Sequence, residues 1–186
     1  MDIKNILAGS NSFTEDLVRL NALDLEKWEF PAGALFGSAE KWWAEKSSRA
    51  KKHNGLDLRF YETRAGEIKA LAGKTKIPLL RAGRILKIIP DFLGSSIFAG
   101  HDILEAGRRL FTIYGHMAPD AGIEGKRLEA GSVIGQLSEN KKKTVPPHLH
   151  ISIALIPESM SVKDLSWETL DESGKVFFLD PAEVIY

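Results

Sequence analysis

The feature that most limits the fold is a two-residue alternation of apolar and polar side chains, which begins at His53. This alternation is typical of half-buried β-strands. Glycine, proline or charged turns separate the segments, and few helical segments lie between them. Many short strands in this arrangement predict a mainly antiparallel β domain, either a sandwich or an open barrel. The predicted strands are residues 56–62, 83–89, 96–99, 109–114, 132–137 and 148–155.

A short helical segment precedes these strands. Ser12 and Glu15 form a Ser-x-x-Glu capping box, and apolar residues follow it, which predicts a helix over about residues 14–21. We therefore divide the chain into a helical preface, residues 1–29, and a β domain, residues 30–186. The end of the chain is expected to pack back on that domain.

Composition excludes several classes of function. The 25 basic and 25 acidic residues cancel, so nucleic acid or an anionic membrane surface is not expected as the main partner. The absence of cysteine excludes disulfides, thiolate zinc sites and cysteine nucleophiles. No apolar run reaches the roughly 18 residues of a membrane span. Residues 1–20 lack a continuous apolar stretch, so no signal peptide is expected there.

Two histidines lie on one side of the last predicted strand. Strand alternation puts His148, His150 and Ser152 on one face, and leucine and isoleucine residues on the other. Both imidazoles are therefore expected to point away from the apolar core. Taken alone, a His-x-His pair is more often solvated than bound to a metal.

The first predicted strand repeats this logic. His53 and Asp57 share its polar face, and two imidazoles with one carboxylate are a common ligand set for catalytic zinc. His116 follows a further strand and is expected where a loop begins. Alone it is more often a hydrogen-bonded structural histidine, but with the other two segments it completes a pattern that chance would rarely supply.

These segments together resemble the lysostaphin-type (LytM-type) zinc metallopeptidases, which are peptidoglycan endopeptidases. The resemblance covers roughly residues 30–155, and its histidine pattern is specific. It implies a duplicated hybrid-barrel (barrel-sandwich) β domain. The matching elements are His53-x-Gly55-x-Asp57, Tyr114-Gly115-His116-Met117, residues 128–136 and Pro147-His148-Leu149-His150.

The resemblance implies a role for each matched residue. His53, Asp57 and His150 are similar to the family's zinc ligands, which gives one zinc per chain. His116 and His148 are similar to its catalytic histidines, and their division of labour stays open. The implied substrate is the peptide part of peptidoglycan, and the implied location is extracytoplasmic, in the periplasm or cell envelope.

Other residues depart from the family pattern or lie outside it. The basic run Lys141–Lys143 replaces a glycine- and serine-rich turn and is expected to be a solvated loop tip. Residues 38–52 are expected to form a helix or an ordered loop that restricts or occludes the cleft. On a strand, adjacent tryptophans point to opposite sides, so at least one of Trp42 and Trp43 is expected in the core. His101 receives no catalytic role.

Three alternatives to an active endopeptidase stay open at this point. The first is a non-catalytic domain of the same fold that binds or activates another cell-wall hydrolase. Such degenerate relatives usually lack a ligand, and this chain lacks none. The second is a histidine phosphotransfer module of related β architecture, which would need no ligand carboxylate. The third is a β domain with incidental histidines. The sequence is silent on oligomeric state and on the bond cleaved.

Overall fold

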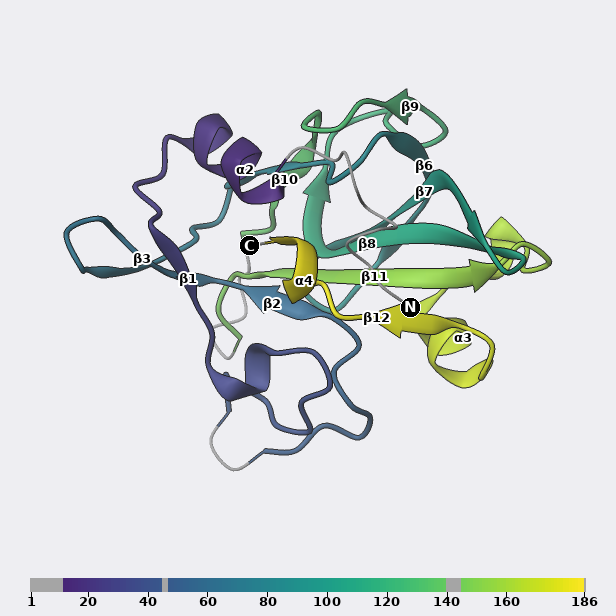
Figure 1. Cartoon of the computed structure of the whole chain (residues 1–186), viewed down its shortest axis with the longest axis horizontal. Helices are drawn as coiled ribbons and strands as arrows, with labels where there is room; N and C mark the ends of the chain where they lie inside the picture. Colours follow the sequence, from purple (N-terminus) through teal and green to yellow (C-terminus); the bar gives the residue numbers. More distant parts are fainter. Residues whose placement is uncertain (1–11, 45–46, 140–144, 186) are drawn as a thin grey trace.

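The computed structural model describes residues 12–44, 47–139 and 145–185, and its strands form two antiparallel sheets. The main sheet follows the order β12-β11-β8-β7-β6-β9. Beside this path, β10 pairs with β8, β5 pairs with β10, and β2 pairs with β11. A small sheet has the order β1-β3-β4 (Figure 1). The main-sheet strands are β2 Leu56–Leu58, β5 Lys76–Pro78, β6 Gly83–Pro90, β7 Ser95–Glu105, β8 Arg108–Pro119, β9 Arg127–Leu128, β10 Val133–Leu137, β11 Leu149–Pro157 and β12 Phe177–Leu179; the small-sheet strands are β1 Lys27–Glu29, β3 Phe60–Glu62 and β4 Ile68–Ala70.

The prediction of a mainly antiparallel β domain with a short N-terminal helix is confirmed. No pairing among the described strands joins β12 to β9, so the duplicated barrel form of that prediction is not established. The division at residue 30 also stays a prediction. Helix α2, Phe13–Asn21, begins after Ser12, whose hydroxyl accepts the backbone N–H of Glu15 as the capping box requires.

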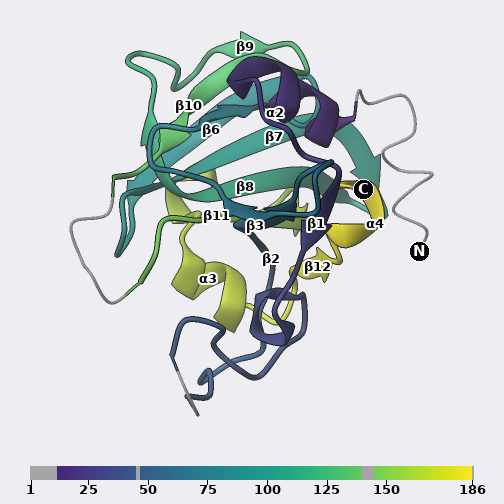
Figure 2. The ribbon, with the colours of Figure 1, turned by 90° about the vertical axis from the view of Figure 1, so that its left-hand side faces the viewer.

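Short helices complete the chain, and the tail does pack back on the domain. Helix α4, Ala182–Ile185, contacts α2, and β12 pairs with β11. Helix α3, Trp167–Glu172, and the segment between β1 and β2 lie on the same side of the main sheet in both views (Figures 1 and 2). Two 3₁₀ turns are η1, Ala32–Ala34, and η2, Val162–Asp164. None of the helices in the described part of the chain is long and apolar enough to cross a membrane.

Two strand predictions differ from the structure in ways that affect the site. The single strand predicted over residues 56–62 is two strands, because the chain leaves the main sheet at Arg59 and enters the small one. The strands predicted around residues 96–99 and 109–114 are longer and form the hairpin β7–β8. Ala106 and Gly107 at its tip both have positive φ, the conformation that a tight two-residue hairpin loop requires.

The polar face of β11 is buried, although its imidazoles were expected to point away from the core. One cluster of core side chains, including Leu149 and Ile151, packs on one face of the strand. A second cluster, including Ala154 and Leu170 of α3, covers the other. Each residue of β11 from Leu149 to Ile156 is therefore buried, histidine included. The strand register thus places polar groups in an environment where each needs a partner.

Candidate metal centre

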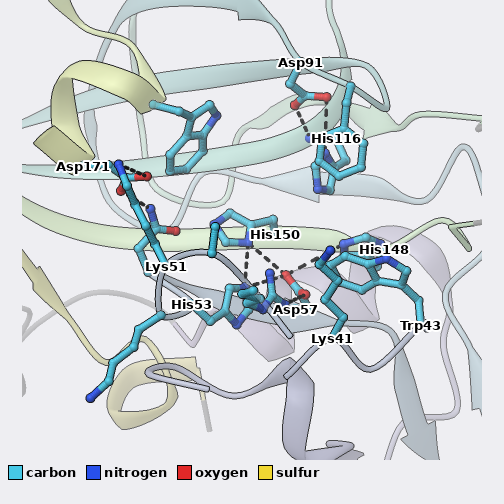
Figure 3. A pocket seen from close by; sticks show the side chains of 16 residues that line it. Lys41, Trp43, Lys51, His53, Asp57, Asp91, His116, His148, His150 and Asp171 are labelled. Atoms are coloured by element: carbon cyan, nitrogen blue, oxygen red, sulfur yellow. Dashed lines mark hydrogen bonds and ion pairs between the residues drawn. The ribbon is translucent and has the colours of Figure 1, made fainter. Parts of the chain in front are cut away.

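Three ligand-type side chains converge where β2 meets β11. Asp57 and His150 are direct partners in the antiparallel pairing, and His53 lies just before β2. Asp57 Oδ1 is 2.8 Å from His150 Nδ1 and 3.1 Å from His53 Nε2, and these two nitrogens are 3.1 Å apart (Figure 3). The three residues are buried. Two strands in register and a short loop thus bring both imidazoles and the carboxylate to one point.

Gly55 makes this close approach possible. A Cβ atom at that position would lie 2.5 Å from the carbonyl oxygen of Ile151 and 2.7 Å from His150 Cε1. Both distances are shorter than a van der Waals contact, and the first neighbour is backbone that cannot move aside. The glycine inside the His53-x-Gly-x-Asp57 segment is therefore required by packing against β11.

Hydrogen bonds outside the cluster select the nitrogens that face it. His53 Nδ1–H donates to the carbonyl oxygen of Leu35 at 3.0 Å, which leaves Nε2 as the lone-pair nitrogen. His150 Nε2 is engaged by the Ser152 hydroxyl at 2.9 Å, so Nδ1 faces Asp57. Outer hydrogen bonds of this kind orient histidine ligands in metal sites.

Asp57 uses its two oxygens differently. Its Oδ2 accepts from Trp42 Nε1–H at 2.9 Å and from the Arg49 guanidinium at 3.3 Å, while Oδ1 faces the two histidines. Burial alone would raise the pKa of Asp57, but the adjacent His150 and His53 hold it well below its usual range. The carboxylate is therefore ionised, with one oxygen held by the protein.

This donor set fits a metal ion. Burial lowers the pKa of His150 to about 4, despite the opposing hydrogen bond and charge of Asp57, so that imidazole is neutral near pH 7. Two imidazole nitrogens and a carboxylate oxygen lie within 4.8 Å of one another, and each can be a ligand to one shared cation. Two histidines and one carboxylate with room for a further ligand are a frequent arrangement at catalytic zinc.

His148 lies beside the cluster with an unpartnered nitrogen. Its Nδ1–H donates to the carbonyl oxygen of Pro146 at 2.8 Å, and its Nε2 is 3.8 Å from Asp57 Oδ1. This Nε2 is buried and has no hydrogen-bond partner among the described residues. Burial lowers the pKa of His148 to about 4, so the ring is a neutral base near pH 7. A buried acceptor of this kind is available to an atom of a ligand or substrate in the pocket.

His116 reaches the same place from β8, and the expectation that it begins a loop is wrong. It lies inside the strand with φ of 66°, where the pairing of β8 with β7 shifts register. Such a bulge redirects a side chain, and a non-glycine residue with positive φ is uncommon. The bulge brings the His116 ring centroid to 4.7 Å from that of His148.

A pocket of about 560 Å³ opens above these side chains (Figure 3). Residues of the segment between β1 and β2 form one wall, so this segment restricts the cleft but does not fill it. Beyond η1, its described residues 38–44 and 47–52 form an irregular loop with an isolated bridge between Glu40 and Ser48, rather than a helix. The pocket is lined by Lys41, Trp43, Arg49, Ala50, Lys51, Lys52, His53, Asn54, Asp57, Asp91, Phe92, His116, His148, His150, Trp167 and Asp171.

The expectation that Trp42 or Trp43 joins the core is wrong. They lie in a turn of this loop, both are half-buried, and both pack on His148, with ring centroids 5.1 Å and 5.7 Å away. The two rings can share a target because a turn, unlike a strand, does not send adjacent side chains to opposite sides.

The structure brings all five predicted site residues to one pocket and leaves His101 outside it. His101 is buried between the Ala82 carbonyl and the Thr112 hydroxyl, and burial lowers its pKa to about 4. The basic run Lys141–Lys143 lies outside the described residues. Sequence reasoning missed Asp91, Arg49 and Trp167, which come from a turn, a loop and a late helix without a recognisable motif.

Comparison with known proteins gives structural matches only, since no family model and no curated protein sequence matches the chain. The catalytic domain of the antimicrobial peptidase lysostaphin from Staphylococcus simulans matches with a TM-score of 0.56 and 15% identity, covering 94% of this chain and 98% of that domain. A structure of the antimicrobial peptidase lysostaphin from that organism matches with a TM-score of 0.51 and 18% identity, covering 90% of this chain and 51% of that one. The fold of this chain is therefore that of the lysostaphin-type peptidases.

Proposed function

We propose that this chain is a zinc metalloendopeptidase that hydrolyses peptide bonds of bacterial peptidoglycan. The observation that carries the proposal is the convergence of His53 Nε2, Asp57 Oδ1 and His150 Nδ1 in a pocket that also contains two further imidazoles. The fold of a known peptidase supports the reaction class. The choice of peptidoglycan rests on the resemblance of the histidine motifs and on that fold. It implies an extracytoplasmic site of action.

In this proposal His53, Asp57 and His150 hold one zinc ion. Zinc bound by such ligands lowers the pKa of a coordinated water and polarises a substrate carbonyl. Burial keeps the His150 imidazole neutral, and hydrogen bonds to Leu35 and Ser152 orient the two imidazole ligands. Trp42 and Arg49 hold Asp57 Oδ2, which leaves Oδ1 as the ligand oxygen.

The two remaining histidines provide proton transfer. His148 Nε2 carries a lone pair that no described residue engages in a hydrogen bond, so it can accept a proton from a group in the pocket. His116 faces the pocket from the opposite strand and can bind the same reacting groups. A scissile peptide bond in the pocket beside these two rings would have two acid–base groups within reach. The aromatic and basic wall formed by Trp43, Lys41 and Lys51 gives the rest of the peptide a surface to lie on.

The experiment is digestion of purified cross-linked peptidoglycan by the zinc-loaded protein, with mass spectrometry of the released fragments. New amino and carboxyl ends within the peptides, absent with the His116→Ala variant at equal zinc content, are the expected result. Intact peptides after digestion of both glycine-bridged and directly cross-linked peptidoglycan would contradict the proposal. Binding to peptidoglycan or to another wall hydrolase without cleavage would favour the non-catalytic alternative.

A further inference from the structure

The turn between β6 and β7 contains a carboxylate with five hydrogen-bond donors. Asp91 Oδ1 accepts the backbone N–H groups of Leu93 and Gly94 at 2.9 and 2.8 Å, and Oδ2 accepts the Ser96 hydroxyl at 2.8 Å. The remaining two donors both belong to His116, which is 25 residues away in the sequence. The first two bonds fold the turn, and the contacts with His116 are additional.

Asp91 forms hydrogen bonds with both the backbone N–H and the imidazole ring of His116. The backbone N–H of His116 donates to Oδ2 at 2.8 Å, and ring Nδ1 is 3.2 Å from Oδ1. Because an ionised carboxylate can only accept, the neutral form of the ring has its proton on Nδ1 and its lone pair on Nε2. Burial alone would raise the pKa of Asp91, but the hydrogen bonds from His116 keep the pKa of this carboxyl well below its usual range.

Two aromatic contacts restrict the ring further. Its centroid is 4.7 Å from that of Phe92 and 4.7 Å from that of His148, both in edge-to-face geometry. Behind Asp91, the Ser96 hydroxyl accepts from Trp167 Nε1–H at 2.9 Å, which connects the turn to helix α3. The bulge in β8, the two bonds to Asp91 and the flanking rings thus give His116 a single orientation, with a side-chain exposure of 11%.

We infer that Asp91 is a positioning residue that fixes the Nδ1–H tautomer of His116 and directs its Nε2 into the pocket. The inference rests on the proposed function for its catalytic meaning, but the tautomer is a property of the protein itself. A carboxylate that orients an imidazole in this way sets which nitrogen exchanges protons with substrate. His148 obtains the same tautomer from a backbone carbonyl, so the two rings present Nε2 to the pocket by different means.

The first test measures the tautomer directly by nuclear magnetic resonance. In zinc-loaded, ¹⁵N-labelled wild-type protein, at a pH where the ring is neutral, we expect two-bond correlations that place the His116 proton on Nδ1. The asparagine amide of Asp91→Asn can donate as well as accept a hydrogen bond. We therefore expect the Nε2–H tautomer of His116 to become populated. Asp102→Asn, a matched change on the exposed end of β7, is the control and leaves the tautomer unchanged. A wild-type ring protonated on Nε2 overturns the inference without any variant.

The second test asks whether Asp91 acts through His116 in catalysis. We expect Asp91→Asn to lower kcat by about 100-fold with little change in KM and with full zinc content, as for loss of one acid–base group. In the His116→Ala background the same change should lower kcat no further. A further 100-fold loss in that background would show an independent structural role and overturn the inference. If the wild type hydrolyses no peptide, the proposed function fails, and the resonance experiment still decides the tautomer.

Discussion

The two sides of the pocket are built on different principles. The side with His53, Asp57 and His150 depends on a strand ladder, in which Asp57 and His150 are direct partners. The side with His116 depends on a β-bulge and on Asp91 in a distant turn. A ladder fixes positions through repeated backbone bonds, whereas the bulge needs one side chain to hold it. The ladder therefore suits the proposed ligands, which must keep a fixed geometry. The bulge suits His116, whose ring must point in one direction.

The largest effect is expected from a substitution in the group His53, Asp57 and His150. Asp57→Ala removes the carboxylate oxygen that both histidines face, so zinc content should fall from about one per chain to near zero, and hydrolysis should fall with it. Elemental analysis of desalted protein measures this. His101→Asn changes a buried histidine outside the pocket and should keep its zinc. Full zinc in Asp57→Ala would remove Asp57 from the ligand set.

Breaking the other side should separate metal binding from turnover. His116→Ala removes an acid–base group but no ligand, so zinc content should stay near one per chain while kcat falls about 10²- to 10⁴-fold. Steady-state hydrolysis of a defined wall peptide and elemental analysis on the same sample check both parts. Loss of zinc in this variant would mean that the two sides do not act separately.

His101, which belongs to neither side of the pocket, should make the stability of the fold depend on pH. Burial lowers the pKa of His101 to about 4 from 6.5, so as pH falls below 6.5 the unfolded chain takes up a proton that the folded chain refuses. This group therefore destabilises the fold progressively between pH 6.5 and about 4.

In the His101→Asn variant the unfolded chain takes up no proton at this position, because asparagine does not titrate. The variant should be less stable than wild type at pH 7, because Thr112 loses its acceptor, and the difference should shrink by about 2 kcal/mol by pH 5. Urea unfolding of both proteins with chelator at the two pH values measures the difference. A constant gap would show that His101 titrates normally in the folded protein.

The smallest effect is expected from removing the hydrogen bond that Trp42 donates to Asp57. Trp42→Phe keeps the aromatic packing on His148 but removes the hydrogen bond to Asp57 Oδ2, so zinc affinity should fall about 10-fold. Trp43→Phe is the matched control, because Trp43 contacts the rings of Trp42 and His148 and the Arg49 guanidinium. Competition titration with a zinc indicator compares the two. Equal affinities would show that the indole N–H does not position the carboxylate.

The difference between the two sides also explains what could be predicted from sequence. Strand alternation and the spacing of His148 and His150 indicated one face of β11, and the His53-x-Gly55-x-Asp57 segment carries its own geometry. Both depend on neighbours in sequence or in register. The position of His116 inside a strand and its contact with Asp91 depend on a register shift, which leaves no periodic signal.

The remaining misses have a similar cause. Trp42 and Arg49 reach Asp57 from an irregular loop, and Trp167 comes from a helix of six residues. Strands β1, β4, β5, β9 and β12 have two or three residues each, too few for an alternation to be recognised. The fold class was predictable because it depends on the long strands, and the outer contacts of the site were not.

The proposed zinc site can be located by an anomalous difference map from a crystal of the zinc-loaded protein, recorded on both sides of the zinc absorption edge. We expect one zinc peak, within bonding distance of His53 Nε2, Asp57 Oδ1 and His150 Nδ1, with His116 and His148 outside the ligand set. No peak at this position at full zinc occupancy elsewhere, or a zinc ion bound by His116, would contradict this expectation.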